Sequence, residues 1–139
     1  MIRFFLLFMT IGLPAAALAG NLDVSVTGVR NANGHVLVAV CSEANFLSAT
    51  CAYSGQAAAH AGSVVVRVTG LPSGTYAVQA YHDENDNRVL DRSFLGFPKK
   101  GMGFSRDAPI RFGPPSFADA AVSVPAAGGA IGFGLRYPD

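Results

Sequence analysis

The residues of this chain best suited to chemistry form a run of acidic and amide side chains between positions 82 and 91. Counted from Asp83 as position 1, the candidate ligands at positions 1, 3, 5, 7 and 9 are Asp83, Asn85, Asn87, Val89 and Asp91. Such alternation lets a tightly coiled loop point carboxylate, amide and main-chain carbonyl oxygens at one hard cation, as calcium-binding loops do. The spacing therefore predicts a calcium site, with a weak dissociation constant of about 10⁻⁴–10⁻³ M.

Two positions depart from the calcium-loop pattern. Arg88 stands where such loops prefer glycine for a sharp turn, and Phe94 stands at position 12, where a bidentate Glu is usual. The formal charge is also small, because only Asp83 and Asp91 are acidic at ligand positions. These departures favour the alternative interpretation, an Asx-rich turn whose side chains accept hydrogen bonds from their own backbone. Calcium is the one cofactor that the sequence suggests.

The same region holds residues from which an acid–base catalyst could be built. His82 lies beside the acidic run, and Ser105 and Ser116 are the candidate nucleophiles of a periplasmic hydrolase-like enzyme that uses His82 and neighbouring carboxylates. Adjacent residues of a strand point to opposite faces, so His82 and Asp83 cooperate only if the strand ends before them. The sequence has no Gly-x-Ser-x-Gly elbow and no His-Glu-x-x-His motif. We therefore expect a non-catalytic binding or assembly module, with the hydrolase as the alternative.

A long segment without hydrophobic alternation, residues 91–117, follows the acidic run and is rich in Phe, Gly and Pro. Connections of this length are usually functional or packed as a cover over the domain. Exposed rings beside polar side chains suit a sugar or peptide ligand. The candidate ligand surface consists of His82, Phe94, Phe97 and Phe104. The alternative, favoured on hydrophobic grounds, is that the rings fold back and close the open end of the domain.

The first 19 residues have the layout of a cleaved secretory signal peptide. Arg3 supplies the positive charge, residues 4–13 form the apolar run, and Ala17-Leu18-Ala19 fits the small-residue cleavage site. The run is too short to span a bilayer, and no later stretch reaches the roughly 18 apolar residues of a membrane helix. We expect residues 20–139 to form a single β-sandwich domain that is monomeric and either periplasmic or secreted.

The charge balance narrows the class of partner. Without Arg3 the chain carries nine basic and nine acidic residues, so its formal net charge is zero with neutral His. Its one basic pair is Lys99-Lys100, and a neutral chain without a basic patch has no electrostatic footprint for nucleic acid or anionic lipid. The expected partner is therefore an extracytoplasmic protein or a carbohydrate.

The two cysteines, Cys41 and Cys51, have nine residues between them. In an oxidising compartment an isolated pair at this distance predicts a disulfide that closes a short loop and stabilises the fold by about 2–3 kcal/mol. A metal pair or a catalytic thiol is the alternative, but neither a Cys-x-x-Cys spacing nor a nearby His accompanies the two residues.

Short strands must position all of these residues. Period-two alternation or β-branched runs mark the expected strands, which cover residues 22–29, 35–41, 64–68, 75–81, 120–124 and 130–137. The Asn-Gly turn at residues 33–34 predicts that the first two strands form a hairpin. One helical turn is expected near residues 43–48. About seven short strands separated by turns predict an all-β, antiparallel β-sandwich with an immunoglobulin-like or transthyretin-like Greek key.

One motif supports the sandwich class directly. Leu71-Pro72-Ser73-Gly74-Thr75-Tyr76-Ala77-Val78 resembles the turn and strand of transthyretin-like and collagen-adhesin B-type sandwich domains. Pro fixes one backbone angle of such a turn, Gly permits a positive φ, and the aromatic ring then enters the core between the sheets.

A longer series of motifs resembles an exported bacterial family known as domain of unknown function 2141. Besides residues 74–78, the matching segments are His82-Asp83-Glu84-Asn85-Asp86-Asn87, Leu90-Asp91, Gly96-Phe97-Pro98, Gly101-Met102-Gly103-Phe104-Ser105 and Gly113-Pro114-Pro115-Ser116-Phe117-Ala118-Asp119-Ala120. The resemblance implies a small exported sandwich protein and brings no established activity. The family pattern has Gly in place of Arg88 and an acidic residue near Lys99-Lys100, and both departures count against a metal role.

Overall fold

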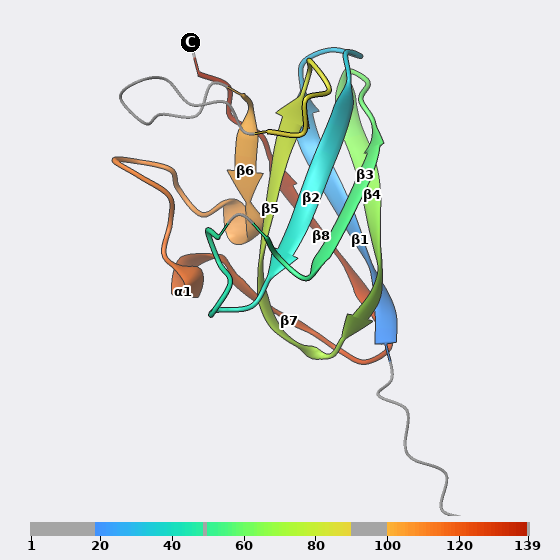
Figure 1. The fold of residues 1–139 in the computed structure, drawn as a ribbon, viewed down its shortest axis with the longest axis vertical. Coiled ribbons are helices and arrows are strands. Elements are labelled where there is room, and N and C mark those ends of the chain that lie inside the picture. The colour runs from blue at the N-terminus through green and yellow to red at the C-terminus, as the bar shows by residue number, and fades with distance from the viewer. Residues whose placement is uncertain (1–18, 49, 90–99, 139) are drawn as a thin grey trace, which may run out of the picture.

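The computed structural model describes residues 19–48, 50–89 and 100–138, which form eight strands, one helical turn and a short 3₁₀ helix. Figure 1 shows these elements, whose bounds in chain order are β1 (Ala19–Val29), β2 (His35–Cys41), β3 (Tyr53–Ala58), β4 (Gly62–Pro72), β5 (Gly74–Asp83), β6 (Met102–Phe104), η1 (Ser105–Asp107), α1 (Phe117–Ala120), β7 (Ala121–Val124) and β8 (Gly129–Gly134). The predicted signal peptide lies, except for Ala19, outside the described residues. No helix in the described ranges is long and apolar enough to cross a membrane.

The strands form two sheets. The three-stranded sheet has the order β4-β1-β8, with β1 antiparallel to β4 and parallel to β8. The second sheet has the order β3-β2-β5-β6, and β7 pairs with the other part of β5; every pairing in it is antiparallel. The predicted all-β sandwich is confirmed.

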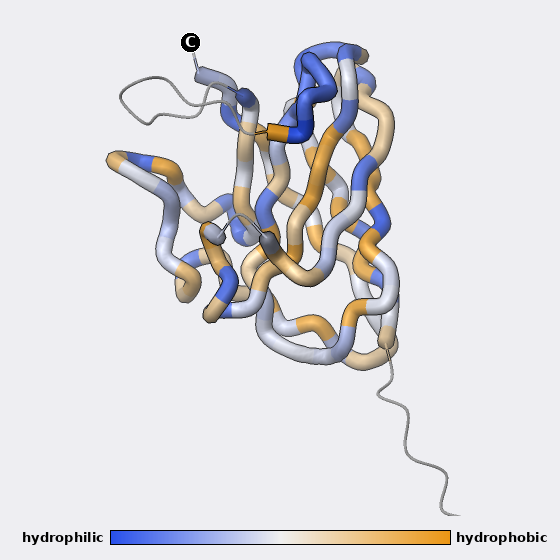
Figure 2. The backbone as a smooth tube through the Cα atoms, viewed as in Figure 1, coloured by the Kyte–Doolittle hydropathy of each residue, from blue (hydrophilic) through white to orange (hydrophobic). Residues whose placement is uncertain are grey.

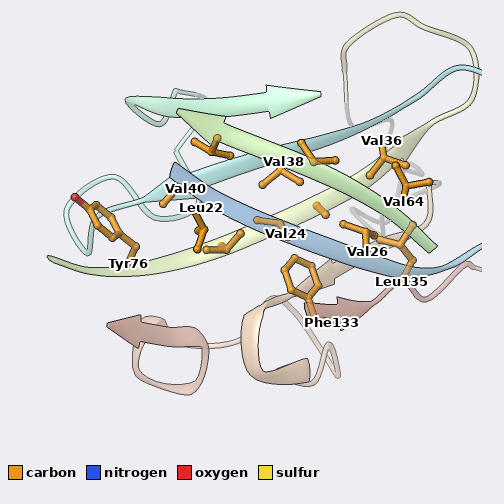
Figure 3. Packing of buried hydrophobic residues seen from close by; sticks show 14 of the residues in the cluster. Leu22, Val24, Val26, Val36, Val38, Val40, Val64, Tyr76, Phe133 and Leu135 are labelled. Atoms are coloured by element: carbon orange, nitrogen blue, oxygen red, sulfur yellow. The ribbon is translucent and has the colours of Figure 1, made fainter. Parts of the chain in front are cut away.

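Alternating apolar residues fill the space between the two sheets. Val24 and Val26 of β1 and Val36, Val38 and Val40 of β2 are all buried, while the residues between them are less so. Figure 3 shows side chains of both sheets pointing toward one another in this core. Because a strand's side-chain period is two, each of these strands keeps one face for the core and leaves the other for solvent or for a site.

The prediction that the first two strands form a hairpin is wrong. Gly34 has a positive φ of 66°, so the Asn-Gly turn is present. However, β1 belongs to one sheet and β2 to the other, and the turn carries the chain across the sandwich. A side chain at Gly34 would collide with the Asp83 carbonyl oxygen, which shows how closely this turn packs on the end of β5.

The sequence pattern did not predict two of the strands, β3 and β6. The helical turn expected near residues 43–48 does not form. β3 is made mainly of Ala, Gly, Ser and Gln, and β6 has only three residues within a Gly-rich segment. Residues 43–48 form consecutive turns, with Asn45 N–H bonded to the Ser42 carbonyl and Ser48 N–H bonded to the Asn45 carbonyl. Leu47 has a positive φ of 66°, which interrupts any helix there.

The disulfide forms and the Tyr76 ring is buried as predicted, but the positive φ near this turn is at Gly70 (66°) and not at Gly74. Tyr76 enters the core, and its hydroxyl donates a 2.8 Å hydrogen bond to the Pro72 carbonyl. Cys41 at the buried end of β2 is disulfide-bonded to Cys51. This bond holds the intervening loop against the end of β2.

A second apolar cluster covers part of the five-stranded sheet from outside. Its buried members are Ala77, Met102, Phe104, Ala108 and Ala120. The Phe46 ring contacts the rings of Phe104 and Phe117 edge to face, with centroids 6.0 and 5.9 Å apart. Phe104 and Phe117 therefore pack as a cover, but over the outer face of a sheet and not over the open end of the domain, and Phe112 of the same segment is exposed.

Candidate functional site

The acidic run begins inside a strand and continues as a tight loop. β5 ends at Asp83, whose side chain is buried, and residues 84–89 turn back from it. The Asn85 side-chain oxygen accepts from the Asn87 N–H, and that of Asn87 accepts from the Val89 N–H. These are the Asx-type bonds that the alternative interpretation expected. Figure 2 shows hydrophilic residues gathered at this end of the sandwich.

The loop bends where the sequence pattern places its sharp turn. Arg88, at the position where calcium-binding loops prefer Gly, has a φ of 58°. A side chain in this left-handed region costs about 1–2 kcal/mol relative to the right-handed one. The Arg88 N–H donates a 2.7 Å hydrogen bond to Asp83 Oδ2, which holds the strained turn in place.

The ammonium group of Lys100 lies at the centre of this loop. Its Nζ donates to Asp83 Oδ1 at 2.6 Å and to Asn87 Oδ1 at 2.6 Å. It also donates to the main-chain carbonyl of Val89. Lys100 lies two residues before β6, and its side chain is nearly buried. Three of the five predicted calcium ligands thus turn their oxygens toward one ammonium.

The Asp83 carboxylate is held in its charged form. Burial alone raises the pKa of Asp83, but hydrogen bonds from Lys100 and from the Arg88 N–H outweigh it, so the pKa lies below its ordinary 3.8. The charge of Lys100 acts in the same direction. The Asp83 carboxyl group is therefore ionised near neutral pH.

The calcium interpretation stays a prediction. Oxygens of Asp83, Asn87 and Val89 converge on Lys100 Nζ. The Asn85 side-chain oxygen accepts a hydrogen bond from the Asn87 N–H. Asp91 lies outside the described residues, as does Phe94. In the ranges that the structure describes, no three His, Cys, Asp or Glu side chains are grouped as for a metal ion.

His82 is buried at the base of the same loop. A carbonyl only accepts, so Nε2 donates to the Asn33 carbonyl at 2.7 Å, and in a neutral ring Nδ1 then accepts from the Tyr137 hydroxyl at 2.7 Å. The Tyr137 oxygen also accepts from the Arg30 N–H at 3.1 Å. Each ring nitrogen thus has a partner, and His82 ties β5 to the turn after β1 and to the C-terminal segment.

Two of the four residues predicted to form a ligand surface are buried, so the prediction is wrong for them. His82 and Phe104 are 0% and 1% exposed, respectively, because one closes a hydrogen-bond network and the other fills the second apolar cluster. Phe94 and Phe97, the other two members, lie outside the described residues.

The candidate nucleophiles have structural roles. The Ser105 hydroxyl is buried, accepts from the Val78 N–H at 3.0 Å and donates to the Ala120 carbonyl. Ser116 caps α1 by accepting from the Asp119 N–H. Within the described part of the chain, neither serine is hydrogen-bonded to an imidazole or a carboxylate side chain.

A groove of about 540 Å³, which sequence reasoning missed, lies on the outer face of the five-stranded sheet. It is lined by Leu37, Val38, Ala39, Ser48, Thr50, Cys51, Ser54, Gly55, Gln56, Gln79, Tyr81 and Arg88. The strand register explains its floor, since side chains opposite one another in paired strands share a face. One row runs Gln56–Leu37–Tyr81 across β3, β2 and β5, and the next runs Ser54–Ala39–Gln79.

The two loops already described form the ends of the groove. Ser48, Thr50 and Cys51 come from the disulfide-closed loop at the Cys41 end of β2. Arg88 comes from residues 83–89, here called the Asp83 loop. This loop lies at the opposite end of the groove because Asp83 pairs with His35, at the other end of β2 from Cys41. Period-two alternation could have identified Gln79 and Tyr81 as outward-facing, but not that three strands place them in one groove.

Comparison with known proteins places the chain in one family. The comparison with curated proteins and that with solved structures gave no match. A family model, described as an uncharacterized protein conserved in bacteria, matches residues 24–131. This range contains the second part of β1, all of β2 to β7 and the first half of β8, including the loop, the disulfide and the groove. The chain belongs to the bacterial family called domain of unknown function 2141.

Proposed function

We propose that this protein is an exported, non-catalytic binding module whose groove takes a neutral carbohydrate. The observation that carries the proposal is the groove itself, a hollow of about 540 Å³ on a sheet face whose other side is the core. Ligand sites are commonly hollows of about 300–1,000 Å³ with a few polar groups that orient the ligand.

The lining of the groove supports a neutral polar ligand. Gln56 and Gln79 each offer an amide donor and an acceptor, and Ser48, Ser54 and Thr50 offer hydroxyl groups. Neutral sugars present both donors and acceptors, so they match such a surface better than a charged ligand does. Tyr81 adds an aromatic ring, and Arg88 adds the one formal charge among the described lining residues.

The same lining supports binding rather than catalysis. Among the described residues that line the groove there is no imidazole and no carboxylate, the groups that most often transfer protons. His82, on which the hydrolase alternative depends, faces the core side of β5 and has both ring nitrogens hydrogen-bonded. An acid–base mechanism would have to expose His82 first.

Export is part of this proposal. The layout of residues 1–19 and the disulfide between Cys41 and Cys51 both suit an extracytoplasmic protein, because disulfides persist in oxidising compartments. A fusion of residues 1–19 to a reporter that is active only outside the cytoplasm tests this point. Activity that survives deletion of the apolar run would contradict it.

The ligand is tested with a panel of neutral oligosaccharides, followed by titration calorimetry of those that bind. Replacing Gln79 by Ala removes a hydrogen-bonding side chain from the floor, and we expect roughly tenfold weaker binding. Arg67→Ala is the control for a substitution outside the groove, because Arg67 lies on β4 in the other sheet. The proposal fails if no oligosaccharide binds, or if Gln79→Ala and Arg67→Ala bind equally well. Binding of a protein partner that Gln79→Ala abolishes would replace the carbohydrate assignment.

A further inference from the structure

The centre of the Asp83 loop contains a cation supplied by the chain itself. Lys100 Nζ is surrounded by a carboxylate oxygen, an amide oxygen and a main-chain carbonyl oxygen. These come from Asp83, Asn87 and Val89, which stand at positions 1, 5 and 7 of the loop. In calcium-binding loops the same positions supply side-chain, side-chain and main-chain oxygens to the ion.

The distances fit this comparison. Nζ lies 2.6 Å from Asp83 Oδ1 and 2.6 Å from Asn87 Oδ1, which is at the upper end of the roughly 2.3–2.6 Å typical of calcium–oxygen contacts. An ammonium is a compact charge with three donors, so three oxygens arranged for a small cation can also satisfy it. The Lys100 side chain is 7% exposed and that of Asp83 is 1% exposed, so the pair lies inside the protein surface.

We infer that Lys100 is the resident cation of this loop and occupies the place of a metal ion. The loop therefore needs no calcium, because the ammonium neutralises Asp83 and binds the oxygens that a metal would bind. Calcium cannot enter while Nζ is present, since a divalent ion would share the same oxygens with a positive group at contact distance. Removal of the ammonium leaves a loop whose oxygens can bind calcium.

Asp83 links this cation to the rest of the loop. Its Oδ1 accepts from Lys100 and its Oδ2 accepts from the Arg88 N–H, so one carboxylate holds both the cation and the left-handed turn. Lys100 Nζ also lies 5.8 Å from the centroid of the Tyr81 ring. The inference concerns this cation alone and stands whether or not the groove binds a carbohydrate.

The test compares calcium binding by the wild type, Lys100→Ala and Lys100→Ala/Asp83→Asn. Thermal unfolding is measured with 0 and about 10 mM CaCl₂ at matched ionic strength, well above the weakest dissociation constants of such loops. We expect no shift in the wild-type midpoint, a lower midpoint for Lys100→Ala that calcium raises by several degrees, and no rescue of the double variant. The inference is overturned if calcium stabilises the wild type, or if Lys100→Ala folds and does not respond.

A measurement on the unmodified protein covers the case in which Lys100→Ala does not fold. With ¹⁵N-labelled lysine, the ammonium protons of Lys100 should exchange slowly with water, because Nζ is buried and hydrogen-bonded. The signal is assigned with Lys100→Arg. We expect it to be unchanged by about 10 mM CaCl₂. Its absence, or its loss on addition of calcium, would overturn the inference.

Discussion

Two ion pairs of almost equal length lie in contrasting parts of this molecule. Lys100 Nζ is 2.6 Å from Asp83 Oδ1, and the two side chains are 7% and 1% exposed. Arg67 Nε is 2.8 Å from Asp23 Oδ1, with side chains that are 61% and 38% exposed. The first pair connects the last residue of β5 to Lys100, which lies two residues before β6, and the second joins the neighbouring strands β1 and β4.

The contrast shows that distance alone does not measure what an ion pair contributes. Water surrounds the exposed pair and replaces either partner's interaction when the other is removed, so such pairs contribute little. The buried pair has lost that water, and each charge depends on the other and on nearby polar groups. In addition, the Asp83 carboxylate accepts a hydrogen bond from the Arg88 backbone N–H. The Asp23 carboxylate accepts its hydrogen bonds from the Arg67 side chain.

The largest expected effect is the loss of the buried ammonium. Lys100→Met keeps most of the side-chain volume but leaves the Asp83 carboxylate uncompensated, and we expect the free energy of unfolding to fall by about 3–5 kcal/mol. Urea unfolding followed by circular dichroism measures the change. The control is Arg67→Met, which should leave the urea midpoint almost unchanged. Similar losses in both variants would contradict the contrast between the two pairs.

A second prediction concerns the coupling within each pair. In a double-mutant cycle with Asp83→Asn and Lys100→Met, we expect a coupling energy of about 1–3 kcal/mol, because neutralising Asp83 removes most of the cost of losing Lys100. The same cycle with Asp23→Asn and Arg67→Met should show no coupling above experimental error. Additive effects at Asp83 and Lys100 would mean that the two residues act independently.

A smaller effect, opposite in sign, is expected at the turn that the buried pair supports. Arg88→Gly relieves about 1–2 kcal/mol of left-handed strain and costs about 0.4–1 kcal/mol through the more flexible unfolded chain. We therefore expect a net gain of about 0.5–1 kcal/mol in unfolding free energy, together with weaker ligand binding because Arg88 lines the groove. Destabilisation by Arg88→Gly would show that the side chain contributes more than the strain costs.

The smallest expected effect is a difference between Asp83 and Asp23 in how the free energy of unfolding depends on pH below about 4. The folded-state pKa of Asp83 lies below its unfolded value of about 3.9, so its contribution is complete above that value and is lost as pH falls through the folded pKa. Below about pH 4 the wild type should lose stability more steeply than Asp83→Asn.

Asp23→Asn is the control for this slope. The hydrogen bond from Arg67 lowers the pKa of Asp23 as well, but the group is exposed to solvent. We expect Asp23→Asn to keep nearly the wild-type acid slope because solvent screens the pair. Equal slopes for the wild type and Asp83→Asn would contradict the assignment to Asp83.

Much of the fold could be predicted because alternation is a local signal. Six of the expected strands correspond to β1, β2, β4, β5, β7 and β8, in which Val and other apolar residues recur with period two. β3 has no β-branched residue, so its pairing with β2 rests on its neighbour rather than on its own pattern. The hairpin prediction failed because a turn sequence specifies a change of direction but not the sheet that the next strand joins.

The site was predictable only in part, for a related reason. The oxygen spacing and the need for a sharp turn at Arg88 were visible in one short segment. The cation in that loop comes from Lys100, and no local period connects a residue after a long irregular segment to Asp83. The groove likewise joins outward faces of β2, β3 and β5, whose order in the sheet differs from their order in the chain.

The parallel pairing of β1 with β8 has a consequence for the order of events during synthesis. β1 is the central strand of its sheet, yet one of its two neighbours is the last strand of the chain. Until β8 is made, one edge of β1 lacks its partner, and the non-local closure that follows is slow compared with local pairing. The three-stranded sheet therefore stays incomplete for as long as the chain is being extended. That delay would suit the export proposed above, in which the chain crosses a membrane before it folds.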